Sequence, residues 1–369
     1  MYPALSFDLL DGLKAGLTQH ITTSITWAVE GIGFATDAHE VQTKAQKLLM
    51  QDDVDMVVGM MSRRMADTLN TLFTGANRLL LVLDLMGEFF LGLPPAPTMF
   101  FHSLQSCLSC RLAGRKAVES GAEGIIQAAS FYDAGYLHGY AASQGVTTGG
   151  GHMVQYFVSS HIPAQANFQN LQAGLSSGQA QAVVALYAGD MARQFLEVYP
   201  TLTGRLPVWA SPLALEEQML TTVPYAMDGI RGFVPWSEHL DTEENRIFRE
   251  AVQKRGRRPT LFSVLGYEGG LILANYLRLT DENNRDSPAV FNQLASLSFE
   301  GPRGQVAFDP ATHFSFAPPY AATVIADNQG RCRLAALTPE RTVEQDFRAF
   351  QTESPPTAYT GWHNTYLCI

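Results

Sequence analysis

The sequence is poor in charge, has no long apolar run and contains few cysteines, and each of these features excludes a class of protein. Charged residues make up 16% of the 369 residues, and 25 Lys and Arg against 35 Asp and Glu give a formal net charge of −10. Phosphate contacts need clustered Lys and Arg, so this balance argues against a nucleic-acid partner. The most apolar run, residues 79–83, stops at Asp84. It is far shorter than the roughly 18 residues that a membrane-spanning helix needs.

The four cysteines are too scattered for a disulfide scaffold. Cys107 and Cys110 have the spacing of a redox pair or of half a zinc site, but no second Cys or His pair lies at a suitable distance. We interpret the cysteines as structural, with a metal or redox role as the minor alternative. If the protein is exported, three pairings among Cys107, Cys110, Cys332 and Cys368 remain open.

Motifs of nucleotide-binding proteins and hydrolases are also missing. Gly149-Gly150-Gly151 is not followed by the Gly-Lys-Ser/Thr of a phosphate-binding loop, and Gly31-x-Gly33 lacks the third glycine of a dinucleotide fingerprint. The sequence has no G-x-S-x-G and no H-E-x-x-H, and its histidines have no ligand spacing. We therefore expect no catalytic residues, no cofactor and no resident metal.

Short apolar strands alternate with amphipathic helices along the chain. Strands are expected at 25–33, 55–59, 79–83, 124–130, 153–159 and 182–187. Helices are expected at 5–17, 37–51, 64–77, 104–120, from about 135, and at 168–177. Strands of this length separated by helices form βαβ units with parallel sheets. The pattern therefore predicts an α/β protein with two Rossmann-like lobes.

Several short motifs occur in a characteristic order along nearly the whole chain. They are Leu48-Leu49 followed by 53–59 and Ser62, then 131–136, 183–189, Pro235-Trp236 with Phe248, 266–269, and 299–309 (F-E-G-P-x-G-x-V-x-F-D). Their order resembles that of the type I periplasmic solute-binding proteins of ABC transporters, in the branch that binds branched-chain amino acids. The last motif is the most specific of the set.

The resemblance implies two lobes with parallel sheets joined by a three-crossover hinge. The first lobe would comprise 1–104 and 238–304 and the second 105–237 and 305–340, with a tail at 341–369 that packs near the hinge. It further implies a monomeric, extracytoplasmic protein, periplasmic or anchored to the membrane. Such a protein would capture a small polar, amino-acid-like ligand between closing lobes and deliver it to an ABC transporter permease. A ligand-sensing module of the same fold is the main alternative, and an α/β enzyme would need a nucleophile–base pair that the sequence does not display.

The amino terminus departs from the family pattern. The family begins with a strand that runs into a ligand-contacting loop, whereas here Met1-Tyr2-Pro3 already resembles that loop and leads directly into a leucine-rich helix. No basic segment, apolar segment or cleavage site precedes the helix. One interpretation is a chain that begins with this helix. The other, which we favour, is that Met1 is an internal methionine, with the first strand and a signal peptide encoded upstream.

Ligand contacts are expected where strands end. Ser62 lies between a strand and a helix, where hydroxyl and backbone N–H groups capture carboxylates; its alternative role is a plain helix cap. Gly87 would allow close backbone approach, and Arg63 or Arg64 would pair with a further anionic group. Aromatic walls with polar hydroxyls are expected from tyrosines that might otherwise belong to the core. These are Tyr2, Tyr132, Tyr136, Tyr187 and Tyr267.

The recognition of an ammonium group is the weakest part of the resemblance. The family places an acid after the strand that corresponds to 207–210, but here Ser211 follows, and Glu216 and Glu217 lie several residues further on. We include Ser211 among the expected ligand contacts. The displaced acids argue against a standard α-amino acid and leave polar amides, peptides and other small organic acids open.

Overall fold

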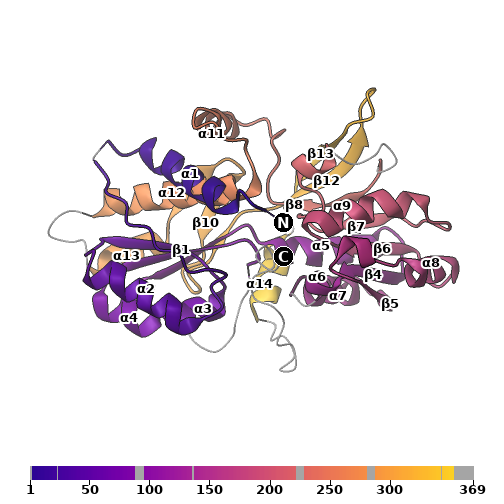
Figure 1. Cartoon of the computed structure of the whole chain (residues 1–369), viewed down its shortest axis with the longest axis horizontal. Coiled ribbons are helices and arrows are strands. Elements are labelled where there is room, and N and C mark those ends of the chain that lie inside the picture. The colour runs from indigo at the N-terminus through magenta and orange to yellow at the C-terminus, as the bar shows by residue number, and fades with distance from the viewer. Residues whose placement is uncertain are drawn as a thin grey trace. The chain divides into compact units, whose positions relative to one another are not determined.

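The computed structural model describes residues 2–22, 24–87, 95–134, 137–221, 228–280, 287–341 and 343–352. The chain divides into two compact units, each described here by itself (Figure 1). Unit 1 comprises Met1–Tyr2, Gln105–Leu240 and Pro318–Ile369, and unit 2 comprises Pro3–Leu104 and Asp241–Ala317. The chain passes from one unit to the other at 104/105, 240/241 and 317/318, and also at 2/3 because Tyr2 belongs to unit 1. The expected lobes changed over at 104/105, 237/238 and 304/305.

Unit 1 is built on a seven-stranded sheet with the order β13-β12-β8-β7-β6-β4-β5. The strands are β4 (Gly124–Ser130), β5 (His152–Ser159), β6 (Ala182–Leu186), β7 (Val208–Ala210), β8 (Arg231–Val234), β12 (Tyr320–Ala326) and β13 (Cys332–Pro339). Strands β4 to β8 are parallel, as expected, but β12 and β13 are antiparallel. The antiparallel hairpin at this edge, closed by a tight turn at Asp327 and Gly330, was not expected.

Helices cover the sheet of unit 1. They are α5 (Ser106–Glu119), α6 (Phe131–Ala134), α7 (Leu137–Thr148), α8 (Gln169–Ser176), α9 (Gly189–Val198), α10 (Glu217–Leu220) and α14 (Val343–Thr352). The helices α5 and α7 lie in direct backbone contact at two glycines: a Cβ on Gly114 would collide with the Ala142 carbonyl oxygen, and one on Gly145 with that of Arg111. Cys107, Cys110 and Cys332 are free and buried, whereas Cys368 lies outside the described residues.

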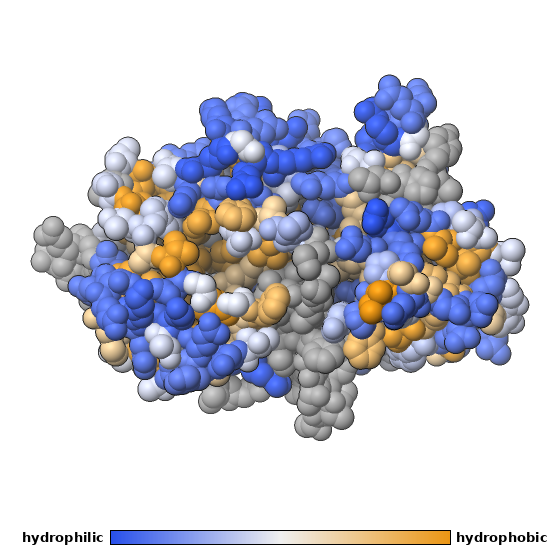
Figure 2. All heavy atoms as spheres, in the orientation of Figure 1, coloured by the Kyte–Doolittle hydropathy of each residue, from blue (hydrophilic) through white to orange (hydrophobic). Residues whose placement is uncertain are grey.

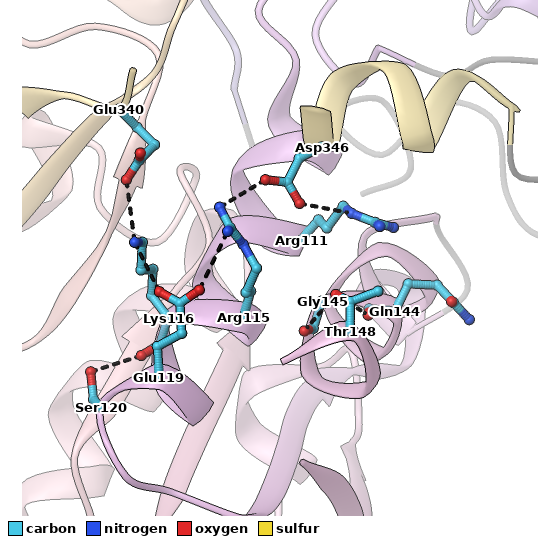
Figure 3. Close-up of polar contacts among 10 residues, drawn as sticks. All are labelled: Arg111, Arg115, Lys116, Glu119, Ser120, Gln144, Gly145, Thr148, Glu340 and Asp346. Carbon is cyan, nitrogen blue, oxygen red and sulfur yellow. Dashed lines mark hydrogen bonds and ion pairs between the residues drawn. The ribbon is translucent and has the colours of Figure 1, made fainter. Parts of the chain in front are cut away.

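The carboxyl-terminal helix α14 is held on α5 by both apolar and ionic contacts. Val343, Phe347 and Phe350 are buried. The Asp346 carboxylate accepts Arg111 Nε at 3.3 Å and lies 2.7 Å from Arg115 Nη2 (Figure 3). The described part of the expected tail therefore packs on the helix that begins just after the 104/105 changeover.

Unit 2 contains a three-stranded parallel sheet with the order β1-β2-β3. These strands are β1 (Met56–Met60), β2 (Leu79–Asp84) and β3 (Met99–Ser103). The central strand β2 is buried throughout, in keeping with its unbroken apolar sequence. Strand β3 was not expected. A second, antiparallel sheet is formed by β9 (Ser298–Gly301), β10 (Gly304–Phe308) and β11 (Ser315–Phe316). The motif at 299–309 supplies most of β9 and all of β10.

Two helices of unit 2 lie side by side at very short range (Figure 1). The helices of this unit are α1 (Leu5–Thr18), α2 (Ala38–Met50), α3 (Arg63–Asp67), α4 (Asn70–Ala76), α11 (Glu243–Gln253), α12 (Leu261–Leu279) and α13 (Pro288–Ala295). Gly12 and Gly16 of α1 face backbone carbonyls of α12, while Gly266 and Gly270 of α12 face backbone carbonyls of α1. By contrast, α11 presents a charged, hydrophilic outer surface (Figure 2).

Two of the expected elements differ in the structure. Residues 25–32 belong to no strand and Gly33 lies in a turn with a φ of 54°, so the expected strand is not formed in the described part of the chain. The expected helix at 64–77 is two helices, α3 and α4, interrupted at Thr68 and Leu69. Among the described residues, no helix is both long and apolar enough to cross a membrane.

Candidate ligand-binding site

Three of the expected site residues of unit 1 follow strands that end at one edge of its sheet. Tyr132 lies in α6 directly after β4, Tyr187 follows β6, and Ser211 follows β7. Because β4, β6 and β7 are parallel, their carboxyl ends meet at the same edge. Ligands of open α/β sheets bind at this edge. Tyr136, the fourth residue expected here, lies outside the described residues.

Tyr187 and Ser211 are occupied by the fold of unit 1. The Tyr187 ring is 1% exposed and stacks on Phe195 with centroids 4.6 Å apart. The Ser211 hydroxyl donates to the Tyr187 carbonyl oxygen over 3.0 Å. Both therefore tie the ends of β6 and β7 together, which is the core role that the sequence left open for Tyr187.

Asp133 is a buried acid at this edge that the sequence analysis missed. Its Oδ2 accepts the Ser130 hydroxyl at 2.6 Å and the Ala188 N–H at 3.3 Å. Burial raises the pKa of Asp133 to about 7, although both hydrogen bonds act to lower it. The carboxyl therefore changes charge near neutral pH. The signal in the sequence was the Ser-x-x-Asp spacing at the end of β4, which places the two side chains together.

Tyr2 lies at the amino terminus of α9, among several acids. Its hydroxyl oxygen accepts the Gly189 N–H at 3.2 Å. Removal from water raises the pKa of Tyr2 above its ordinary value, and the carboxylates of Glu216, Asp133 and Asp190 raise it further. The Tyr2 hydroxyl thus experiences both the charge of these three acids and the positive amino end of α9. Glu216, one of the two acids displaced along the chain beyond β7, is among these carboxylates.

An aromatic cluster adjoins these groups in unit 1. The Tyr132 ring lies 5.7 Å from that of Phe131 and 4.6 Å from that of His161, and Phe131 and His161 are 5.9 Å apart. Phe131 is 52% exposed, so part of the cluster is open to solvent. The sequence analysis identified Tyr132 as a ligand contact but neither Phe131 nor His161. His161 follows β5, a different strand from the one before Tyr132.

In unit 2, Ser62 and Arg63 follow β1. The Ser62 hydroxyl accepts the Met65 N–H at 3.3 Å and caps α3. This is its alternative, structural role, and it leaves the hydroxyl proton to donate. Arg63 is buried, with Nε 2.7 Å from Asp67 Oδ1 and its guanidinium 4.5 Å from the centre of the Phe101 ring. The structure thus gives Arg63 partners within its own unit, whereas Arg64 is exposed.

Gly87 follows β2 in a tight turn that Asp84 closes. Asp84 accepts the Met86 N–H at 3.0 Å and the Gly87 N–H at 2.6 Å. Gly87 adopts a φ of 74°, a conformation that a residue with a side chain adopts only with strain. The N–H group expected to approach a ligand is therefore already bonded to the Asp84 carboxylate.

Tyr267 does not lie at a strand end or in a loop, as expected, but within α12. It is 3% exposed, its hydroxyl bonds Gln19, and its ring meets Phe248 edge-on. The structure makes Tyr267 a core residue of unit 2, because the helix turns it inward beneath α1 and α11.

The next residue along α12, Glu268, belongs to a fully buried polar cluster that was not expected. Its Oε2 lies 2.8 Å from Arg303 Nε and 3.1 Å from His102 Nε2. The His102 Nδ1 is 2.8 Å from the Ser315 hydroxyl. Burial opposes ionisation of Glu268, but Arg303 and His102 outweigh it and hold its pKa below the ordinary value.

Two further features of unit 1 involve none of the expected ligand contacts. Donor atoms of Glu217, Glu238 and His239 lie within 4.8 Å of one another, but the two oxygens of Glu217 accept the Ser237 hydroxyl and the Glu238 N–H at 2.7 and 2.6 Å. A cavity of about 620 Å³ opens at the amino ends of β7 and β8, beside Val208 and Ile230. Neither feature coincides with the expected ligand contacts.

Comparison with known proteins identifies the family. A model of the periplasmic binding proteins matches residues 34–330. The chain therefore belongs to the periplasmic binding protein family, and the resemblance to its type I members is confirmed. This is a family of binding proteins rather than enzymes. A search of curated proteins finds no significant match.

Solved structures of similar fold cover almost the whole chain. An ABC transporter substrate-binding protein from Sphaerobacter thermophilus has a TM-score of 0.78 at 21% identity, covering 91% of this chain and 94% of its own. A solute-binding protein from R. palustris in complex with 4-hydroxybenzoate has a TM-score of 0.73 at 18% identity, covering 92% of this chain and 93% of its own. A branched-chain amino acid binding protein from Streptococcus pneumoniae in complex with isoleucine has a TM-score of 0.69 at 16% identity, covering 91% of this chain and 95% of its own. At these identities the likeness establishes the fold and not the ligand.

Proposed function

We propose that this chain is an extracytoplasmic, monomeric solute-binding protein that captures a small amino-acid-like ligand and delivers it to an ABC transporter permease. Membership of the periplasmic binding protein family supports the binding role. The transporter role is supported by the solved structures of similar fold, which include substrate-binding proteins of ABC transporters. A sensory module of the same fold is the alternative that family membership leaves open.

The observation that carries the ligand class is the acidic surrounding of the Tyr2 hydroxyl. Asp133, Asp190 and Glu216 all act on this group through their charge. An ammonium group placed there would be stabilised by opposite charge in a partly buried environment, where such interactions are strongest. The ligand carboxylate would be received by the Ser62 hydroxyl, whose proton is left to donate. Tyr2 and Tyr132 would contact the rest of the ligand.

A second candidate is an aromatic carboxylate without an ammonium group. It is favoured by the exposed ring of Phe131. It is also supported by the R. palustris proteins of similar fold in complex with benzoate and 4-hydroxybenzoate. The two candidates differ in one group, so a matched series of ligands distinguishes them.

Thermal unfolding with such a series tests the proposal. The series is an amino acid, the same molecule without its ammonium, and the same molecule without its carboxylate. A ligand at 100 times its dissociation constant stabilises the folded state by about 2.7 kcal/mol, which raises Tm by several degrees. We expect the intact amino acid alone to give this shift. A shift with the deaminated acid alone would favour the second candidate, and none with any member would overturn the proposal.

Substitutions in the same assay locate the site. Ser62→Ala should abolish the shift by removing the donor to the ligand carboxylate. Asp190→Asn and Glu216→Gln should each reduce it by weakening the attraction for the ammonium. Glu197→Gln removes an exposed charge further along α9 and serves as the control that leaves the shift unchanged.

A further inference from the structure

The ring cluster of Phe131, Tyr132 and His161 is the strongest feature of unit 1 whose role is still unassigned. Ser130 ends β4 and Ser159 ends β5, and these two residues are paired in the sheet. Phe131 and His161 follow them closely in the chain, so two neighbouring parallel strands deliver the rings to one place. The cluster therefore rests on rigid elements, which position a binding surface more precisely than a free loop does.

The cluster is also continuous with the polar groups of the proposed site. Phe131, Tyr132 and Asp133 are consecutive residues of the single-turn helix α6. Asp133 turns inward to Ser130 and Ala188, whereas Phe131 is 52% exposed and His161 is exposed as well. Asp133 and the rings of Phe131 and Tyr132 therefore lie on the same short helix at the carboxyl end of β4.

We propose that Phe131, Tyr132 and His161 form a stacking surface that selects a ligand with a planar aromatic side chain over an aliphatic one of similar size. The inference rests on the proposed function, because it concerns the same ligand. Aromatic rings prefer offset-stacked or edge-on partners at centroid distances of about 4.5–7 Å. The three rings already adopt such spacings among themselves, with centroids 4.6 to 5.9 Å apart. A fourth ring would extend the cluster and cover the exposed face of Phe131.

The geometry of ring–ring contacts gives this assignment its selectivity. A hydrophobic wall alone distinguishes ligands mainly by size, since it gains about the same from any apolar group. A cluster of rings adds a preference for the edge and face of a second ring, which a saturated ring of the same size does not satisfy. The expected discrimination is roughly threefold to tenfold in the dissociation constant.

Isothermal titration of the full chain with L-phenylalanine, L-cyclohexylalanine and L-leucine tests the inference. Phenylalanine and cyclohexylalanine share the ammonium, the carboxylate and nearly the same volume, and they differ in the planar ring. We expect phenylalanine to bind threefold to tenfold more tightly than cyclohexylalanine. Phe131→Leu and His161→Leu should each reduce this ratio, and the double variant should bring it close to one while leaving the affinity for leucine within about twofold.

Tyr156→Leu is the matched control. Tyr156 is a 61% exposed aromatic residue of β5, close in sequence to His161 but outside the cluster. Its replacement should leave the ratio unchanged. Equal affinities for phenylalanine and cyclohexylalanine in the native protein, or a ratio that survives the double variant, would overturn the inference and leave the proposed function intact.

The same titrations with 3-phenylpropanoate and 3-cyclohexylpropanoate separate the two levels of the proposal. A preference for the phenyl acid that depends on Phe131, without binding of any amino acid, would support the stacking surface and contradict the ammonium site. No binding of any of the five compounds by folded protein would overturn the inference together with the proposed ligand class.

Discussion

Arg303 donates from Nε to Oε2 of Glu268 over 2.8 Å, and neither side chain is exposed to solvent. The pair joins the two motifs at 266–269 and 299–309, which lie far apart on helix and hairpin. Gly301 of the hairpin is small for the same reason, since a Cβ there would lie 2.9 Å from Glu268 Oε1. Glu268 of one motif therefore requires a glycine at position 301 and pairs with Arg303 in the other motif.

Breaking this pair should destabilise unit 2 strongly. Glu268→Gln leaves the Arg303 guanidinium buried without a counter-charge, and we expect a loss of about 3–5 kcal/mol in the free energy of unfolding, measured by urea denaturation. Glu300→Gln, at an exposed position of the same hairpin, should change it by less than about 0.5 kcal/mol. The double variant Glu268→Gln/Arg303→Met should recover part of the loss. Equal stability of Glu268→Gln and the control would show that the pair contributes little.

The contact between α1 and α12 predicts a strong effect of a single methyl group. Gly16→Ala places a Cβ against the Tyr267 carbonyl oxygen, well inside van der Waals contact, so the helices must separate. We expect a loss of at least about 2 kcal/mol, seen as a lower Tm. Gly75→Ala is the matched control, because Gly75 lies in α4 with open space around its Cα. It should raise stability by up to about 1 kcal/mol through helix propensity.

His138 predicts how stability depends on acid. Burial lowers its pKa to about 4, and its Nε2 lies 2.8 Å from the Ser106 hydroxyl. Because the unfolded chain binds this proton at its ordinary pKa near 6.5, the stabilisation is present above that pH and is lost as the pH falls toward 4. The loss should reach roughly 3 kcal/mol.

Urea denaturation between pH 7 and pH 4 measures this contribution. His138→Gln should remove this contribution from the pH dependence in that range and leave the contributions of Asp133, His102 and His313. Replacing the exposed His39 by Gln should leave the pH dependence unchanged. Parallel curves for the native protein and His138→Gln would contradict the assignment.

Asp133 predicts a pH dependence of ligand binding, because its pKa is raised rather than lowered. Its pKa of about 7 means that the carboxyl is partly protonated at neutral pH. An ammonium ligand favours the ionised form, so affinity should fall about tenfold per pH unit below 7 and level off above it. Binding at pH 7 should release protons, seen as titration heats that vary with the ionisation enthalpy of the buffer. Affinity that is constant from pH 5.5 to 8 would argue against an ammonium beside Asp133.

Local patterns in the sequence predicted much of the fold. Strand β4 was expected with its observed bounds, and β6 and α8 with bounds within one residue, because each is a short apolar or periodic segment with clear ends. Strand β3 and the strands β12 and β13 were missed. The sequence Met-Phe-Phe-His-Ser follows a proline-rich segment, and the antiparallel edge depends on a turn far along the chain. Residues 25–33 alternate as a strand should, yet the pattern does not supply the neighbour that a strand needs.

The site was predicted less completely, because ligand contacts depend on which strand ends meet. Residues directly after a strand, such as Tyr132 and Ser211, were found from their position alone. Asp133 was overlooked because one of its partners, Ala188, follows a different strand, although Ser130 lies only three residues before it. Tyr267 was misplaced because an aromatic residue in an apolar helix gives no sign of which way it faces.

The most direct test of the central claim is isothermal titration of the folded, ligand-free chain with a panel of amino acids and small organic acids at pH 7.5. The account predicts saturable 1:1 binding of at least one amino acid, lost in Ser62→Ala and weakened in Glu216→Gln. Protein that unfolds cooperatively but gives no saturable heat with any amino acid, or that binds only acids lacking an ammonium, would contradict the proposed ligand.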